Sequence, residues 1–170
     1  MRKIATRIEY SPSIIYHYFK DKDDIINHIV KKTYQKIIGS LASTQINAVE
    51  PAQKLKEMTR NYIDIALEMS DEYITIMLSR SPAILEHTSV LFNGASQKRP
   101  ALGILCKCLK ELHPIADDNL LELTAQVMWS ATFGLIIRLT TEKTIDAEQK
   151  EKLIEHHLDL IINGMARDLS

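Results

Sequence analysis

Residues 11–25 read SPSIIYHYFKDKDDI, and this stretch decides the fold. Ser11 followed by Pro12 is a strong helix start, because the serine hydroxyl can accept from a backbone N–H and proline at the first helical position has none to lose. Asp21 suits the N-cap of the next helix, with Asp23 and Asp24 in its first turn. Two short helices followed by a long one are typical of helix-turn-helix geometry.

Two short amphipathic faces are predicted within this arrangement. The first helix, which ends near Tyr10, presents Ile4, Ala5 and Ile8 on one side. The inward face of the helix that begins at Pro12 is predicted to hold Ile15, Tyr18 and Phe19, while Ser13, Ile14 and His17 project elsewhere.

The pattern Ile-Ala, then Ser11, then YHYFKDKDDI at residues 16–25 resembles the end of the DNA-binding domain of TetR-family (tetracycline-repressor-like) transcriptional regulators. The resemblance implies that base edges in the major groove face Pro12, Ser13, Ile14 and His17. It implies that DNA phosphates are held by Tyr16, Tyr18 and Lys22, with Ser11 nearby. Tyrosine hydroxyls and a lysine can donate to phosphate oxygens, and a small Ser13 beside an apolar Ile14 allows close approach and contact with a thymine methyl. Packing in the core is the alternative role for the aromatic residues.

The same resemblance implies a helix before residue 2 and a capping threonine just upstream of Arg2. The sequence contains neither, so either it begins late or the DNA-binding domain lacks its first helix, and in the second case the domain is incomplete. Ile4, Ile8 and Phe19 would then lose partners, at a cost of about 1.5–3 kcal/mol for each large side chain left exposed.

Charge is distributed unevenly along the chain. Residues 1–36 hold eight Lys and Arg against four Asp and Glu, a net charge of +4, and residues 37–170 hold thirteen against eighteen, a net charge of −5. A basic end on an acidic body suits a nucleic-acid-facing module carried by a separate domain, although scatter in a short segment could produce the same numbers. We therefore predict a helix-turn-helix domain at 1–36 and an effector-binding and dimerisation domain at 37–170.

The rest of the chain has the three- and four-residue apolar spacing of amphipathic helices, and Gly and Pro are scarce. Helices are predicted over 22–43, from residue 51, and over 71–78, 101–112, 119–139 and 147–166. Ser81-Pro82 is read as a helix stop, and the pattern loosens around Asn93-Gly94. The predicted fold class is all-α, with an N-terminal helix-turn-helix remnant and a C-terminal ligand-binding and dimerisation domain.

The last two predicted helices are apolar on more than one face, so each needs a partner on both sides. A symmetric homodimer through a four-helix bundle meets that need, and the resemblance implies the same bundle. The alternative is a monomer with unusually complete burial. The predicted dimer interface comprises Met128, Ala131, Leu135, Ile136, Leu153, Leu160, Ile161 and Gly164.

TetR-like regulators typically bind a small effector inside the C-terminal domain, and methionines and aromatic residues make adaptable apolar pockets. Ordinary core packing is the alternative for each such residue. The candidates are Tyr62, Met69, Tyr73, Met77, Phe92, Met128, Trp129 and Phe133.

No catalytic, metal-binding or membrane pattern is found in the sequence. Glu155, His156 and His157 are adjacent, which is not the spacing of a helical zinc pair, and Cys106 and Cys108 are two apart, which suits neither a disulfide framework nor a metal knuckle. No apolar run approaches the roughly 18 residues of a membrane span. We expect a cytoplasmic protein that is not an enzyme and needs no cofactor.

The predicted function is therefore a DNA-binding transcriptional regulator. We expect a ligand-responsive repressor that acts as a homodimer on palindromic double-stranded operator DNA, with a small-molecule effector that the sequence does not identify. The alternative is a dimeric small-molecule-binding or scaffold protein without a working DNA-binding head.

Overall fold

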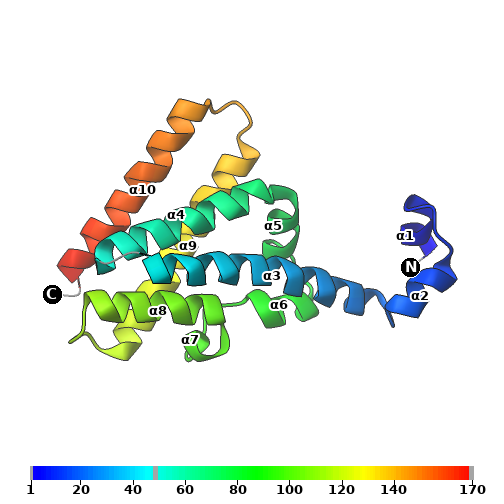
Figure 1. Ribbon diagram of the computed structural model, residues 1–170, viewed down its shortest axis with the longest axis horizontal. Helices are drawn as coiled ribbons and strands as arrows, with labels where there is room; N and C mark the ends of the chain where they lie inside the picture. The colour runs from blue at the N-terminus through cyan, green and yellow to red at the C-terminus, as the bar shows by residue number, and fades with distance from the viewer. Residues whose placement is uncertain (1, 48–49, 169–170) are drawn as a thin grey trace.

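The computed structural model of the chain describes residues 2–47 and 50–168, and within these ranges it contains ten α-helices and no strand. The helices are α1 (Arg2–Arg7), α2 (Pro12–Tyr18), α3 (Lys22–Asn47), α4 (Pro51–Glu68), α5 (Ser70–Met77), α6 (Pro82–Thr88), α7 (Ala95–Lys98), α8 (Pro100–Leu112), α9 (Asp118–Thr141) and α10 (Ala147–Asp168). The all-α fold class is confirmed. Figure 1 shows α1 and α2 at one end of the long α3, and α4 to α10 gathered around its other part.

The helix-turn-helix segment is shaped by its caps, as predicted. The Ser11 hydroxyl accepts from the Ile14 N–H at 3.4 Å, and Pro12 takes the first position of α2. Asp21 accepts from the Asp24 N–H at 2.8 Å, and Asp24 in turn accepts from the Lys20 N–H at 3.0 Å. These reciprocal bonds satisfy backbone donors at the start of α3, which is why that helix begins where it does.

The centre of the fold is α4, which packs against α3, α8, α9 and α10. Its Leu55, Ile63 and Ala66 side chains are completely buried. Its polar side meets α10 through a network of ion pairs, in which Arg60 contacts Asp64, Glu151 and Glu155 and Lys56 contacts Glu155 and Asp159, at 2.5–3.1 Å. Networks of this kind set the position of one helix along another more than they add stability.

Two short helices depart from the sequence prediction. Pro82 does not simply stop a helix: it occupies the first turn of α6, where the missing N–H costs nothing. The four-residue α7 depends on a distant residue, because the Glu122 carboxylate of α9 accepts from the backbone N–H groups of Gly94 (2.7 Å) and Ser96 (3.0 Å). A contact between residues so far apart in the chain leaves no local sequence signal.

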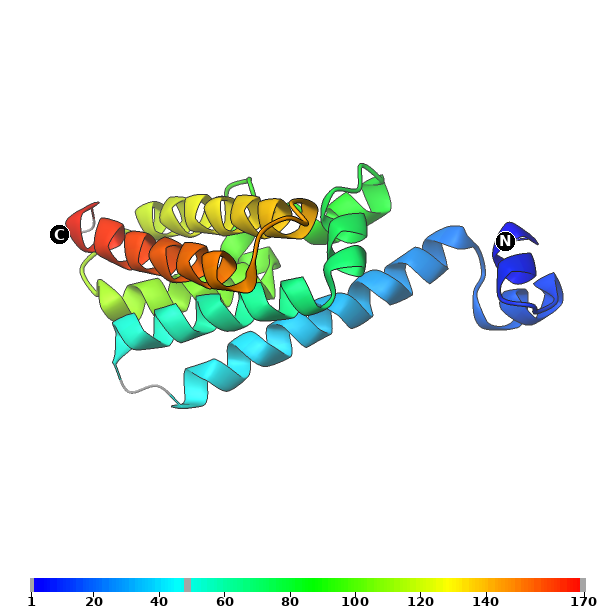
Figure 2. The same cartoon turned by 90° about the horizontal axis from the view of Figure 1, so that it is seen from above.

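By length and composition alone α9 could cross a membrane, which contradicts the prediction that no apolar segment reaches that length. In this fold α9 packs against α4, α8 and α10, and the core helix of a soluble protein passes the same test of composition. Figure 2 shows α9 and α10 running side by side along one flank of the body.

Close packing of α7 on α8 gives a test of the fold. A Cβ on Gly103 would lie 2.6 Å from the Ser96 carbonyl oxygen, so Gly103→Ala forces two backbones apart and should lower the free energy of unfolding by about 1–3 kcal/mol. Gly39→Ala is the matched control, because its Cβ meets nothing within 4 Å on α3. We expect that control to raise stability by about 0.5–1 kcal/mol in denaturant unfolding. Equal effects at both sites would contradict the observed α7–α8 packing.

Candidate nucleic-acid interface and helical body

The helix α2 lies at the surface and is held there by one side chain. Ile15 is its buried residue, at 5% exposure, and α1, which contacts α2, has Ala5 as its buried residue. All the candidate DNA-facing residues are exposed: Ser11, Pro12, Ser13, Ile14, Tyr16, His17, Tyr18 and Lys22. They lie in α2, at its N-cap and at the first position of α3, and they surround the helix on every side except that of Ile15.

One prediction for α2 is wrong. Tyr18 was expected on the inward face with Ile15 and Phe19, but its side chain is 73% exposed and meets the His17 ring edge-on, with the ring centroids 5.2 Å apart. Phe19 is half-buried and packs instead on His28 of α3, at a centroid distance of 5.8 Å. The reason is that α2 ends at Tyr18 and Phe19 takes an extended conformation, so helical spacing no longer relates the two rings.

The apolar face of α1 is only partly covered. Ala5 is 1% exposed, whereas Ile4 and Ile8 are 37% and 51% exposed. Within the described residues, Ile4 and Ile8 thus offer apolar surface beside the candidate DNA-facing helix.

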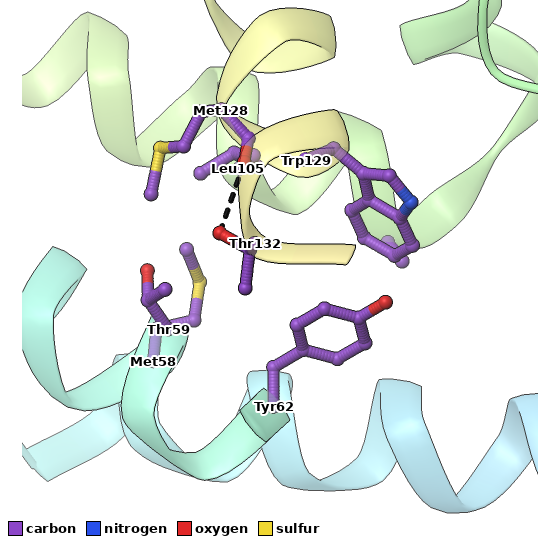
Figure 3. A pocket seen from close by; sticks show the side chains of 8 residues that line it. Met58, Thr59, Tyr62, Leu105, Met128, Trp129 and Thr132 are labelled. Atoms are coloured by element: carbon purple, nitrogen blue, oxygen red, sulfur yellow. Dashed lines mark hydrogen bonds between the residues drawn. The ribbon is translucent and has the colours of Figure 1, made fainter. Parts of the chain in front are cut away.

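A small cavity lies in the body between α4, α8 and α9 (Figure 3). Its volume is about 20 Å³, and its lining residues are Met58, Thr59, Tyr62, Ala101, Leu105, Met128, Trp129 and Thr132. A cavity of this size holds about one water molecule. Both threonine hydroxyls already donate to carbonyls one turn back in their helices, Leu55 at 2.8 Å and Met128 at 2.9 Å, so they offer only lone pairs.

Three of the eight effector-pocket candidates line this cavity: Tyr62, Met128 and Trp129. Five do not. Tyr73 and Phe133 lie behind Tyr62, with their ring centroids 6.2 Å apart, and Met69 forms the joint between α4 and α5. Met77 packs with the cluster of Val30, Ile76 and Ile84, and Phe92 lies in the loop before α7. The sequence reasoning missed Met58, Thr59, Ala101, Leu105 and Thr132, because a helical stripe does not show which residues border a void.

The aromatic wall of the cavity contains a buried pair of hydroxyls. The Tyr62 and Tyr73 hydroxyls lie 2.5 Å apart, and the Tyr62 ring lies against Trp129 at a centroid distance of 4.8 Å. Burial raises the pKa of both phenols, so both keep their protons at neutral pH. One hydroxyl donates to the other, which leaves the second proton without an acceptor in the pair.

An apolar groove runs along the outer faces of α9 and α10. Its lining residues are Leu120, Leu123, Thr124, Val127, Met128, Ala131, Leu160, Ile161 and Gly164. Val127 is 70% exposed, Leu160 is 59% exposed and Leu123 is 56% exposed. A contiguous apolar surface of this kind on a soluble protein marks an interaction site.

Five of the predicted interface residues line this groove: Met128, Ala131, Leu160, Ile161 and Gly164. The other three are placed differently. Ile136 is 0% exposed and belongs to the core of the single chain, and Leu135 and Leu153 are half-buried against that core. The placement of Ile136 at the interface is thus corrected. Leu120, Leu123 and Val127 take the exposed positions instead, because they lie on the side of α9 turned away from Trp129 and Ile136.

The remaining titratable groups do not assemble a reactive site. Burial raises the pKa of the Cys106 and Cys108 thiols to about 11, so both are protonated at neutral pH and poor nucleophiles. Among the described residues, no group of three or more His, Cys, Asp and Glu side chains could hold a metal ion.

The geometry defines an all-helical protein with a helix-turn-helix segment carried on the end of a helical body. A family model described as bacterial regulatory proteins, tetR family, matches residues 1–29. The match supports the resemblance predicted from the sequence: residues 1–29 are similar to the N-terminal segment of the TetR family, whose members are DNA-binding transcriptional regulators. No curated protein matches the chain.

A half-buried histidine next to the cavity should make stability depend on pH. The His157 Nε2 atom lies 3.0 Å from the Thr132 hydroxyl, and burial lowers the pKa of His157 below 6.5. Below pH 6.5 the unfolded chain binds a proton at His157 that the folded chain resists, so stability should fall as the pH falls through this range. His157→Gln should flatten that part of the profile in denaturant unfolding from pH 7.5 to 5.5. The exposed neighbour His156→Gln is the control, and an identical flattening there would refute the assignment.

Proposed function

We propose that the protein is a transcriptional regulator that binds operator DNA through α2 and the first turn of α3. The observation that carries this proposal is the placement of α2: one buried anchor, Ile15, supports a surface on which all eight candidate residues are exposed. The family match over residues 1–29 covers that surface. Tyr16, Tyr18 and Lys22 can donate to phosphates, and we propose that Ser13, Ile14 and His17 meet base edges.

A homodimer would supply the second recognition helix. The groove on α9 and α10 is apolar, exposed and self-complementary in kind, as an isologous interface requires. Two copies packed through these helices form a four-helix bundle, and their two heads could enter successive major grooves of a palindromic operator about 34–36 Å apart.

Effector control would act through the body. The cavity beside Tyr62 and Trp129 has room for about one water, so a larger ligand must displace side chains, and the flexible Met58 and Met128 thioethers are suited to that. If effector and operator prefer different dimer geometries, each weakens the binding of the other, and the factor is the same in both directions. We propose a repressor of this kind, located in the cytoplasm, with no catalytic role.

Salt dependence tests the DNA contact. In fluorescence anisotropy with promoter DNA upstream of the gene, affinity should fall as salt rises, and Lys22→Ala should reduce the slope of log K against log salt by about one for each lysine removed. Lys143→Ala, an exposed lysine in the loop between α9 and α10, should leave the slope unchanged. A slope that does not respond to Lys22 would exclude the phosphate contact. Absence of any DNA binding by a dimeric protein would favour the alternative, a small-molecule-binding or scaffold protein.

Charge placed in the α9–α10 groove tests the dimer. Val127→Asp and Leu160→Asp each put a carboxylate in the centre of the proposed interface, where it would be desolvated without a partner, so both should give monomers in sedimentation velocity. Leu78→Asp is the control, because Leu78 is 53% exposed at the end of α5, away from the groove. Dimers that survive both groove substitutions would place the interface elsewhere.

A further inference from the structure

A second, chemically different concavity lies where α3, α6 and α8 meet. Its volume is about 590 Å³, within the range of small-molecule sites, and none of its nine lining residues is acidic. The residues that matter here are Lys31 and Tyr34 of α3, His87 of α6, Lys98 at the end of α7, and Arg99 and Pro100 at the start of α8. We refer to this concavity as the basic groove.

The cations of the basic groove differ from those at the contact between α4 and its neighbouring helices. Lys54, Lys56 and Arg60 each pair with at least one carboxylate at 2.5–3.1 Å. Lys31, Lys98 and Arg99 pair with none in the part of the chain that the structure describes. Arg99 is half-buried, and a partly desolvated guanidinium without a counter-charge is a favourable place for an anion.

Arg99 is also held in place before any ligand arrives. Its Nε donates to the Ser89 carbonyl at 2.8 Å, and its guanidinium carbon lies 5.3 Å from the centroid of the Phe92 ring. Phe92 itself is fixed to α9, because the Gln126 side-chain amide donates to its carbonyl at 3.0 Å. Preorganised donors bind an anion at a lower entropic cost than flexible surface lysines do.

The start of α8 adds to the positive field of the groove. Pro100 occupies the first turn, no acidic residue follows in that turn, and the side chain of the N-cap residue Arg99 makes no capping hydrogen bond. The Tyr34 hydroxyl accepts from the Ala101 N–H at 3.4 Å, which links α3 to this helix end. The partial positive charge of a 13-residue helix therefore lies beside the three cations.

We propose that the basic groove binds a small phosphorylated molecule, separate from any effector in the interior cavity. A small molecule fits better than the DNA backbone for two reasons. The groove is a concavity enclosed by three helices, and its α3 residues follow the candidate DNA-facing Lys22 by several residues, about 1.5 Å of helix rise for each. The phosphate is bound by Lys31, Lys98 and Arg99, and the Tyr34 and His87 rings flank the rest of the ligand.

Binding there would have a mechanical consequence, which rests on the proposed function. The groove joins the helix that carries the DNA-facing head, α3, to α6 and α8. Through Phe92 and Gln126 it is also connected to α9, one of the proposed dimer helices. A ligand that pulls these elements together changes the angle of α3 on the body, and therefore the spacing of the two heads.

Calorimetric titration of the full chain with inorganic pyrophosphate tests the site. Lys31→Gln combined with Lys98→Gln should weaken pyrophosphate binding at least tenfold and leave the circular-dichroism melting temperature within a few degrees, since both side chains are exposed. Lys32→Gln combined with Lys36→Gln removes the same charge from exposed positions of α3 outside the groove and should change binding less than twofold. Arg99→Gln should also weaken binding at least tenfold.

Three results would overturn the proposal. The first is that the unaltered chain does not bind pyrophosphate at millimolar concentration. The second is that the two double variants weaken pyrophosphate binding equally. The third is that unrelated duplex DNA abolishes pyrophosphate binding, which would make the groove a DNA-backbone contact. Promoter binding measured with and without pyrophosphate separates the proposed phosphate site from the proposed regulatory function. If pyrophosphate binds but promoter affinity does not change, the site stands and its regulatory role falls. If the promoter is not bound at all, the proposed function falls and the site stands.

Discussion

Most of the structure depends on the burial of one face of α3. Val30, Thr33 and Ile37 are 3–7% exposed and follow one another at three and four residues, so a single stripe of the helix is pressed against α4, α5, α6 and α8. Because a helix is stiff over this length, fixing that stripe also fixes where Lys22 and the attached α2 point. The division at residues 36 and 37 predicted between a DNA-binding and an effector domain falls inside this helix. Head and body therefore share one rigid element, and a change in the body has a direct route to the head.

A second constraint comes from two polar side chains of α9 that anchor the chain before α8. The Glu122 carboxylate accepts hydrogen bonds from the Ser96 and Gly94 N–H groups. Its hydrogen bonds, above all those from Ser96, lower the pKa of Glu122 and keep it charged. The Gln126 side-chain amide donates to the Val90 and Phe92 carbonyls. Backbone groups before α8 that have no hydrogen-bond partner within a helix find one here in the side chains of α9. As a result the apolar α9 has three roles at once: it supplies core residues, it holds the loop that carries Arg99, and it exposes the groove proposed for the dimer.

The starts of helices could be predicted from the sequence where they depend on residues close together in the chain. Ser11, Pro12 and Asp21 place the starts of α2 and α3 because their effects reach only three or four residues. Tyr18 was misplaced for a related reason. Its predicted inward position grouped it with Phe19, and helical spacing does not relate these two residues because α2 ends between them. The short α7 could not be foreseen, since the carboxylate that supports it lies 26 residues further along the chain, and the cavity residues Met58 and Leu105 meet only after three helices have packed.

By itself, the sequence determined the helical class, the resemblance of the N-terminal segment to the TetR family and the starts of α2 and α3, because caps and spacing act within one turn of a helix. It also determined that α9 must be apolar on two sides. Only the tertiary structure decided which side of α9 is buried in the core of the chain and which side is exposed. Packing against α4 and α8 buries Trp129 and Ile136 and leaves Val127 outside, a choice that depends on the rotation of the helix about its axis. The same is true of the basic groove, whose cations come from two distant segments of the chain and become neighbours only when α3 meets the start of α8.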